Sequence, residues 1–270
     1  MEIIQLLDLN AKFNSFYEEA NDLKLGYAFK HFSKITDLDV SKPVIITDQI
    51  LPHIDKIRND LVYVWLMEPP SILPWIYDKA YENKNRFQLI FSHNKKYCEN
   101  VDIAKWYPWG SYYIPLNEHK IYDKSKNVSI VASSKQYTEG HRLRHDVIKK
   151  YERLFDGIKC GDPVEPKIKW HNEYRYTVAI ENRPIRGYFT EKIIDCFRTG
   201  TIPIYRGDCE ITNYFDSNGI LLFNNIEELE EILLKCDEDF YNKRIDSVQK
   251  NYKLSENYLY PWKYIKENYL

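Results

Sequence analysis

Glycine is scarce in this sequence, at 9 of 270 residues, and the familiar glycine-rich phosphate motifs are missing. No GxGxxG, GxxxxGK[ST] or GxSxG pattern occurs, which argues against a dinucleotide enzyme, a P-loop NTPase and an α/β-hydrolase. The 38 lysines and arginines do not exceed the 40 aspartates and glutamates. The basic surplus that a dedicated nucleic-acid binder needs is therefore also missing, and we predict no nucleic-acid partner.

Cysteine pairs and long apolar runs are missing as well. The five cysteines are widely spaced without a CxxC pair, so neither a zinc site nor a disulfide framework is indicated. The longest strongly apolar run, residues 61–67, is far short of the ~20 residues that a membrane span needs. The N-terminal stretch MEIIQLLDLN has no basic region typical of a secretory signal. We therefore expect a soluble, cytoplasmic protein without an integral membrane segment.

What the chain does contain is enough apolar material for a substantial core. Hydrophobic residues make up 44% and charged residues 29%, which is not the composition of a disordered chain. Short apolar runs alternate with helical patterns, as in parallel α/β sheets. In the first half we predict strands at residues 44–47, 61–67 and 88–92 and a helix at residues 72–81.

The segment at residues 105–126 interrupts this alternation with proline, glycine and charged residues, which suggests a linker between two lobes. We predict an α/β fold with lobes at residues 1–125 and 126–250, an active cleft between them, and a C-terminal helical segment at residues 251–270. The strands predicted after the linker are residues 128–132, 176–180, 202–205 and 220–223, and the helices are residues 142–154, 190–198 and most of the chain from 226 onward.

The stretch at residues 176–223 carries the chemistry. A strand ends at Glu181 and Asn182, a loop follows, and a helix begins near Thr190 with Glu191 and Lys192 in its first turn. Parallel sheets bind ligands beyond the carboxyl ends of their strands, and helix N-termini attract phosphate. Lysine adds a mobile cation for a diphosphate, and a carboxylate can accept hydrogen bonds from sugar hydroxyls. An exposed helix start without any ligand explains Glu191 and Lys192 equally well.

Residues 181–207, ENRPIRGYFTEKIIDCFRTGTIPIYRG, resemble the signature of family 10 glycosyltransferases, the α1,3-fucosyltransferases. That signature runs approximately F-E-N-S, a loop, G-Y-x-T-E-K, a helix, and a strand such as P-I-Y-W-G. The Asn-Tyr-Phe at residues 213–215 is also similar to the family. The resemblance implies two Rossmann-like, GT-B-like lobes, with the acceptor in the first lobe and the donor in the second. It also implies inverting transfer of fucose from GDP-fucose to a glycan acceptor, with no other cofactor.

The resemblance also implies roles for individual residues. Lys192 matches the lysine that holds the donor diphosphate, and Glu191 matches the glutamate that contacts the sugar. Asn182 and Tyr188 match residues that line the nucleotide pocket. A second phosphate anchor is an arginine at the start of the donor lobe's first helix. Arg144 fits that position best and Arg142 is the near alternative.

Inversion needs a base that takes the proton from the acceptor hydroxyl. In the family this carboxylate lies in the N-terminal lobe after a strand, and Glu68 is the candidate here. It directly follows an apolar run, and Pro69 favours an extended backbone at that position. A plain acid at a strand end is the alternative interpretation.

Three further arginines depart from or add to the family pattern. Arg183 and Arg206 replace the usual Ser and Trp, and Arg186 adds a cation in the loop. We expect these arginines to gather with Arg142, Arg144 and Lys192 around one diphosphate, or to mark a different donor sugar or base. A related transferase with another nucleotide sugar, and a non-catalytic sugar-nucleotide or glycan-binding module, are the alternative functions.

Metal chemistry is not predicted. His141 and His145 have helical spacing for a chelate, but Arg142 and Arg144 beside them repel a cation. The DxD patterns at residues 37–39 and 237–239 are more typical of solvated turns or helix starts.

Overall fold

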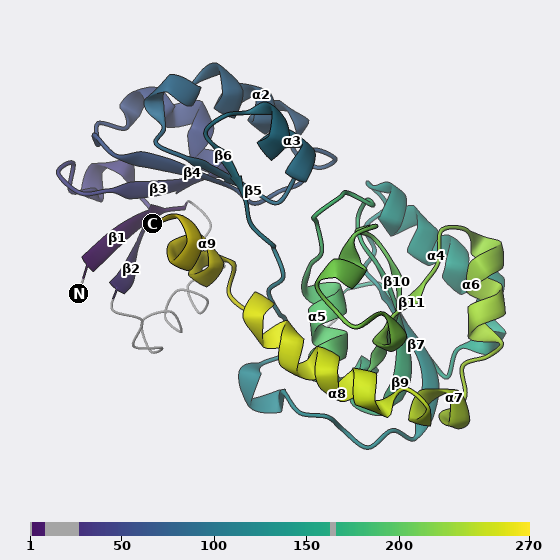
Figure 1. Ribbon diagram of the computed structural model, residues 1–270. Helices are drawn as coiled ribbons and strands as arrows, with labels where there is room; N and C mark the ends of the chain where they lie inside the picture. The colour runs from purple at the N-terminus through teal and green to yellow at the C-terminus, as the bar shows by residue number, and fades with distance from the viewer. Residues whose placement is uncertain (1, 9–26, 163–165) are drawn as a thin grey trace. The chain divides into compact units, whose positions relative to one another are not determined.

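The computed structural model describes residues 2–8, 27–162 and 166–270 of the chain. These residues form two compact units, Met1–Tyr107 with Ile265–Leu270 and Pro108–Tyr264. Each unit is built on its own parallel sheet with helices beside it (Figure 1). This confirms the predicted α/β fold with two parallel-sheet lobes.

The first unit contains a six-stranded sheet in the order β2-β1-β3-β4-β5-β6, with every neighbouring pair parallel. Runs such as VIIT and VYVWL are mostly apolar and almost completely buried because both faces of such a sheet are covered. The strands are β1 (Glu2–Leu7), β2 (Tyr27–Phe32), β3 (Val44–Thr47), β4 (Val62–Leu66), β5 (Ile90–Ser92) and β6 (Ala104–Trp106).

Two α-helices of the first unit follow the expected start signals. Helix α2 (Pro74–Glu82) begins with proline, whose missing N–H is no loss in a first turn. Helix α3 (Lys95–Asn100) is capped by Asn94, whose side chain accepts from the N–H of Tyr97. The core of the unit lies between the strands, α2 and the 3-10 helix η3 (Asp48–Lys56).

The second unit contains a five-stranded parallel sheet in the order β11-β10-β9-β7-β8. The chain starts in the middle at β7, runs to one edge, and then returns past β7 to the other edge. The carboxyl ends of β7 and β9 therefore form a topological switch point, where open α/β sheets bind their ligands. The strands are β7 (Lys126–Ala132), β8 (Gly157–Cys160), β9 (Tyr174–Ile180), β10 (Ile202–Arg206) and β11 (Leu221–Leu222).

Helices cover both faces of this second sheet. Because the chain moves in opposite directions from the switch point, right-handed crossovers place α4 (Glu139–Tyr151) and α5 (Glu191–Arg198) on opposite faces. Helix α6 (Ile226–Leu233) lies on the side of α4, and α8 (Ile245–Leu254) on the side of α5 (Figure 1). The remaining helices are α7 (Glu238–Asn242) and α9 (Pro261–Tyr269). No helix in the described part of the chain is long and apolar enough to cross a membrane.

The boundary between the units lies earlier than the predicted division after residue 125. Residues that follow β6 are already bonded to the second unit, with Gly110 N–H donating to the Phe189 carbonyl at 3.0 Å and Ser111 N–H to the Tyr258 carbonyl at 2.8 Å. Gly110 has a φ of +53°, and a Cβ there would lie 2.1 Å from the Tyr258 oxygen, so only glycine fits this contact. The predicted separate segment at residues 251–270 is also divided between the two units.

Candidate active site

A cavity of about 290 Å³ opens at the switch point of the second unit, beside the carboxyl ends of β7 and β9. Its wall combines cationic, anionic and aromatic side chains from four parts of the chain. Its charged and polar lining residues include Tyr113, Lys135, His141, Arg144, Asp162, Lys167, His171, Asn182, Glu191, Lys192 and Asp195.

Glu181 fixes the start of α5 at the edge of this cavity. It follows β9 directly, is fully buried, and accepts the N–H of Thr190 at 2.9 Å as well as the Thr190 hydroxyl. Thr190 is in turn the N-cap of α5, its Oγ1 accepting from the N–H of Lys192 at 3.4 Å. A carboxylate next to a helix N-terminus is stabilised by the dipole of that helix. The motif that the sequence singled out therefore builds a rigid corner between strand and helix.

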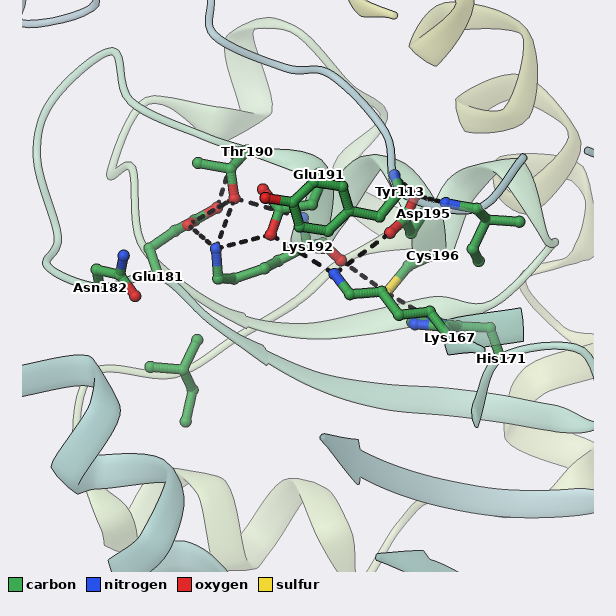
Figure 2. Close-up of polar contacts among 12 residues, drawn as sticks. Tyr113, Lys167, His171, Glu181, Asn182, Thr190, Glu191, Lys192, Asp195 and Cys196 are labelled. Carbon is green, nitrogen blue, oxygen red and sulfur yellow. Dashed lines mark hydrogen bonds and ion pairs between the residues drawn. The ribbon is translucent and has the colours of Figure 1, made fainter. Parts of the chain in front are cut away.

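Lys192 reaches across this corner and contacts three oxygen acceptors (Figure 2). Its Nζ lies 3.0 Å from Thr190 Oγ1, 3.0 Å from Glu191 Oε1 and 3.4 Å from Glu181 Oε2. Burial alone would lower the pKa of Lys192, but Glu191 and Glu181 outweigh it and raise the pKa. Burial would likewise raise the pKa of Glu191, but Lys192 and Lys167 lower it to about 2. Both groups are charged at neutral pH.

A second lysine and a second carboxylate extend this network along α5. Lys167 Nζ lies 3.6 Å from Glu191 Oε1 and 3.6 Å from Asp195 Oδ2. Asp195 Oδ1 accepts the N–H groups of Tyr113 at 2.9 Å and Ile114 at 3.2 Å. Burial raises the pKa of Asp195 to about 6, against the opposing effects of Lys167 and the Tyr113 N–H. The sequence reasoning missed both Lys167 and Asp195, although Asp195 is one helical turn from Glu191.

Arg144 occupies the opposite wall, at the first turns of α4. Its guanidinium donates to the Ile180 carbonyl through Nε at 3.0 Å and Nη2 at 2.6 Å, and to Asn182 Oδ1 at 3.0 Å. Burial lowers the pKa of Arg144, while Glu181 and Glu191 act in the opposite direction. Arg142 is exposed and donates to the carbonyls of Gln136 and Tyr137. The geometry therefore places Arg144, and not Arg142, at the end of β9.

The other predicted arginines do not gather with Lys192 and Arg144. Arg206 pairs with Glu139 at 2.6 Å and lines, together with Arg142, a separate cavity between α4 and α6. Arg186 is half-buried and lies 3.7 Å from Glu210, and Arg183 is exposed. The expected convergence of six cations at one place is wrong, because Arg142 and Arg206 line another cavity, Arg186 pairs with Glu210, and neither Arg183 nor Arg186 lines the cavity of Lys192 and Arg144. Tyr188 is buried and is also absent from the cavity lining.

Glu68 belongs to the first unit and lies two residues beyond β4, which ends at Leu66, one residue earlier than the predicted strand. Its N–H and that of Met67 donate to Asp48, at 2.7 Å to Oδ2 and 2.9 Å to Oδ1. The Glu68 carbonyl accepts from the hydroxyl of Tyr77 at 3.0 Å. Its backbone is thus held from two sides while the residue itself is exposed. Asp48 is buried, and this burial raises its pKa to about 7.

His141, His145 and Asp237, from the sequence patterns considered for metal binding, form hydrogen bonds with other protein groups. His141 is the third residue of α4, and its Nδ1 accepts from the N–H of Thr138 in a capping box. His145 bonds the Ser133 carbonyl, and Asp237 caps α7. Among the described residues, no group of three or more His, Cys, Asp or Glu side chains is placed to hold a metal ion.

Comparison with known proteins first defines the class. The chain is similar to bacteriophage T4 β-glucosyltransferase, with a TM-score of 0.56, 12% identity and full coverage of both chains. It is similar over its whole length to a solved α1,3-fucosyltransferase with GDP-fucose, with a TM-score of 0.60, 16% identity and 91% of that chain covered. The fold of this chain is therefore that of the GT-B glycosyltransferases.

Two fucosyltransferases are similar to this chain in sequence. A predicted fucosyltransferase of Acanthamoeba polyphaga mimivirus, R654, is 25% identical over 220 residues, 72% of this chain. The α-(1,3)-fucosyltransferase FucT of Helicobacter pylori is 28% identical over 93 residues, 34% of this chain. The chain covers 34% and 20% of these two relatives, and no protein-family model matches it. These likenesses support the resemblance to the α1,3-fucosyltransferases that residues 181–207 carry.

Proposed function

We propose that this chain is an inverting glycosyltransferase that moves fucose from GDP-fucose to a hydroxyl of a glycan acceptor. The observation that carries the proposal is the corner of Glu181, Thr190, Glu191 and Lys192 facing Arg144 at the switch point of the second sheet. The similarity to a fucosyltransferase solved with GDP-fucose supports the choice of donor. A cytoplasmic location stays a prediction from the sequence.

Lys192 and Arg144 are the proposed anchors of the donor diphosphate. Both cations are bonded to protein oxygens in the structure, Lys192 to two carboxylates and Arg144 to a carbonyl and an amide oxygen. In this proposal, phosphate oxygens take the place of some of these acceptors. As the bond from the anomeric carbon to the phosphate breaks, negative charge builds on the departing GDP, and the two cations stabilise it.

Glu68 is the proposed base of the single displacement. The acceptor hydroxyl gives its proton to the Glu68 carboxylate while its oxygen bonds to the anomeric carbon. The electron pair of the carbon–phosphate oxygen bond leaves with GDP, and because the hydroxyl attacks from the face opposite GDP, the configuration at that carbon inverts. The backbone bonds to Asp48 keep the end of β4 in place for this role.

The first test is a screen of glycan acceptors with GDP-fucose, read out by mass spectrometry, with the wild type and a Glu68→Gln variant. We expect product with the wild type, and about a 100-fold or greater loss with Glu68→Gln. Binding of GDP, followed by calorimetry, should not change in that variant. Unchanged turnover would remove Glu68 from the mechanism.

A related transferase that uses another nucleotide sugar is the second candidate. It is favoured by a likeness of similar extent to T4 phage β-glucosyltransferase solved with UDP-glucose, with a TM-score of 0.55. Calorimetric titration with GDP-, UDP- and dTDP-sugars separates the two, because only the first should bind under our proposal. A protein that binds its donor and never hydrolyses or transfers it would instead be a binding module.

A further inference from the structure

We propose that Lys167 is a positioning residue of the donor site, holding the Glu191 carboxylate and the Tyr113 ring in place around the sugar of the donor. The inference rests on the proposed function, because it takes Glu191 as the carboxylate that contacts this sugar. Lys167 lies on the 3-10 helix η7 (Lys167–Trp170), between β8 and β9, outside the motif that resembles the fucosyltransferases.

Lys167 joins three parts of the cavity wall. Its Nζ lies 3.6 Å from Glu191 Oε1 and 3.6 Å from Asp195 Oδ2, both on α5. It also lies over the ring of Tyr113, 4.2 Å from the centroid, which is a favourable distance for a cation and an aromatic face. The side chain of Lys167 is 13% exposed, so these contacts form in a largely water-excluded place. Figure 2 shows Lys167 reaching toward Glu191 and Asp195.

Asp195 holds Lys167 at the cavity wall. Its carboxylate is completely buried and is fixed by the N–H groups of Tyr113 and Ile114. Lys167 therefore lies between the buried Asp195 carboxylate and the Glu191 carboxylate, which we propose contacts the sugar. Replacement of the lysine would leave two buried carboxylates on the same helix face without their shared cation, which is costly in a low-dielectric site.

Lys192 and Lys167 both contact the same oxygen atom of Glu191. Lys192 Nζ is 3.0 Å and Lys167 Nζ is 3.6 Å from Glu191 Oε1. When a diphosphate draws Lys192 away from its carboxylate partners, Glu191 loses its nearer cation. Lys167 remains, so Glu191 keeps both its charge and its orientation at the moment when the sugar is bound.

Tyr113 provides the second surface for the sugar. It lines the same cavity, and 57% of the residue is exposed. An aromatic ring offers an apolar face against which the C–H face of a sugar packs, and its hydroxyl can bond a sugar oxygen. Because Lys167 covers one face of the ring and Asp195 holds the Tyr113 backbone, the ring has a defined direction.

The test compares GDP with GDP-fucose as ligands of the full chain. Lys167→Met and Lys167→Gln remove the cation, Lys167→Arg keeps it, and Lys169→Met is the matched control, since Lys169 is exposed on the same 3-10 helix. Calorimetry gives both affinities, steady-state kinetics gives kcat and KM, and thermal unfolding checks that each variant folds.

We expect Lys167→Met and Lys167→Gln to bind GDP within about threefold of the wild type, while GDP-fucose affinity and kcat/KM fall by about 10- to 100-fold. Lys167→Arg should recover most of this loss, and Lys169→Met should behave as the wild type. An equal loss of GDP and GDP-fucose affinity, or no loss of either, would overturn the inference while the proposed function stands. A wild type that neither binds nor turns over GDP-fucose would overturn both.

Discussion

At the scale of single residues, the proposed donor site is a chain of alternating charges. Glu181, Lys192, Glu191, Lys167 and Asp195 follow one another at distances of 3.0 to 3.6 Å. Buried charges are tolerated only with such partners. Under our proposal a diphosphate competes with these carboxylates for Lys192, and this competition would favour ligands that carry two or more negative charges.

Arg144 and Arg142 differ sharply in what they contact, although they are two positions apart. Arg144 is 6% exposed and donates to the end of β9, whereas Arg142 is exposed. We predict that Arg144→Ala lowers the free energy of unfolding by about 1.5–3 kcal/mol, because it leaves buried acceptors without a charged donor. The same variant should weaken GDP binding at least 10-fold.

Arg142→Ala is the matched control and should change stability by no more than about 0.5 kcal/mol. Urea denaturation measures the free energies, and calorimetry with GDP measures the affinities. Equal effects of the two substitutions would show that the choice of Arg144 as phosphate anchor is wrong.

At the scale of elements, the site depends on the close approach of α4 to the end of β9. A Cβ on Gly140, the second residue of α4, would lie 1.8 Å from the Glu181 carbonyl oxygen. Gly140 N–H donates to the Asn182 carbonyl at 2.9 Å, which draws the helix to the strand end. Only glycine allows both elements to share this corner.

Gly140→Ala should therefore destabilise the protein by about 1–3 kcal/mol, since α4 must shift away from β9. In the interior of an ordinary helix, replacing glycine with alanine raises the free energy of unfolding by about 1 kcal/mol. The sign of the change in this free energy is therefore the test. Denaturation by urea gives the sign, and GDP affinity should fall with it because Arg144 moves together with α4. A stabilised variant with normal GDP affinity would contradict this view of the corner.

The elements also show what the sequence could and could not reveal. The strands at β3, β4, β7, β9 and β10 were predictable because their apolar runs are buried on both faces. Strands β6 and β8 were missed because they are short edge strands, with partly exposed residues and no long apolar run.

That Glu181, Thr190, Glu191 and Lys192 lie together could be predicted because these residues are close in the chain and carry a family pattern. Lys167 and Tyr113 could not, because each lies in a loop or short helical turn far from that pattern and is brought there only by the folded sheet. The predicted convergence of the arginines on Lys192 and Arg144 was wrong for a related reason. Sequence proximity says nothing about which acidic partner, such as Glu139 for Arg206, a side chain will find.

At the scale of the whole molecule, buried carboxylates make stability depend on pH. Burial raises the pKa of Asp48 to about 7 from its ordinary value of 3.8. Because the folded state holds this proton more tightly than the unfolded state, the stability that it contributes is complete below about pH 3.8 and is lost as the pH rises through 7. Asp8 and Glu68 face Asp48 and act in the same direction as burial.

We predict that Asp48→Asn is less stable than the wild type at pH 4.5, since the amide cannot accept both the Met67 and Glu68 N–H groups. The difference in free energy of unfolding between the two proteins should be smaller at pH 7.5. At that pH most of the wild-type Asp48 has lost its proton and the stability that the proton contributes. Urea denaturation at the two pH values measures both differences. A deficit that grows with pH would contradict the raised pKa.

The central claim is that the cavity at the switch point of the second unit binds a GDP-sugar whose fucose the chain transfers. The most direct measurement is the release of GDP from GDP-fucose with a glycan acceptor mixture, for the wild type, Lys192→Met and the exposed control Lys149→Met. We predict acceptor-dependent release by the wild type and by Lys149→Met, and a loss of about 100- to 1,000-fold in kcat/KM for Lys192→Met. Equal rates for all three proteins, or no binding of GDP-fucose by the wild type, would contradict the account.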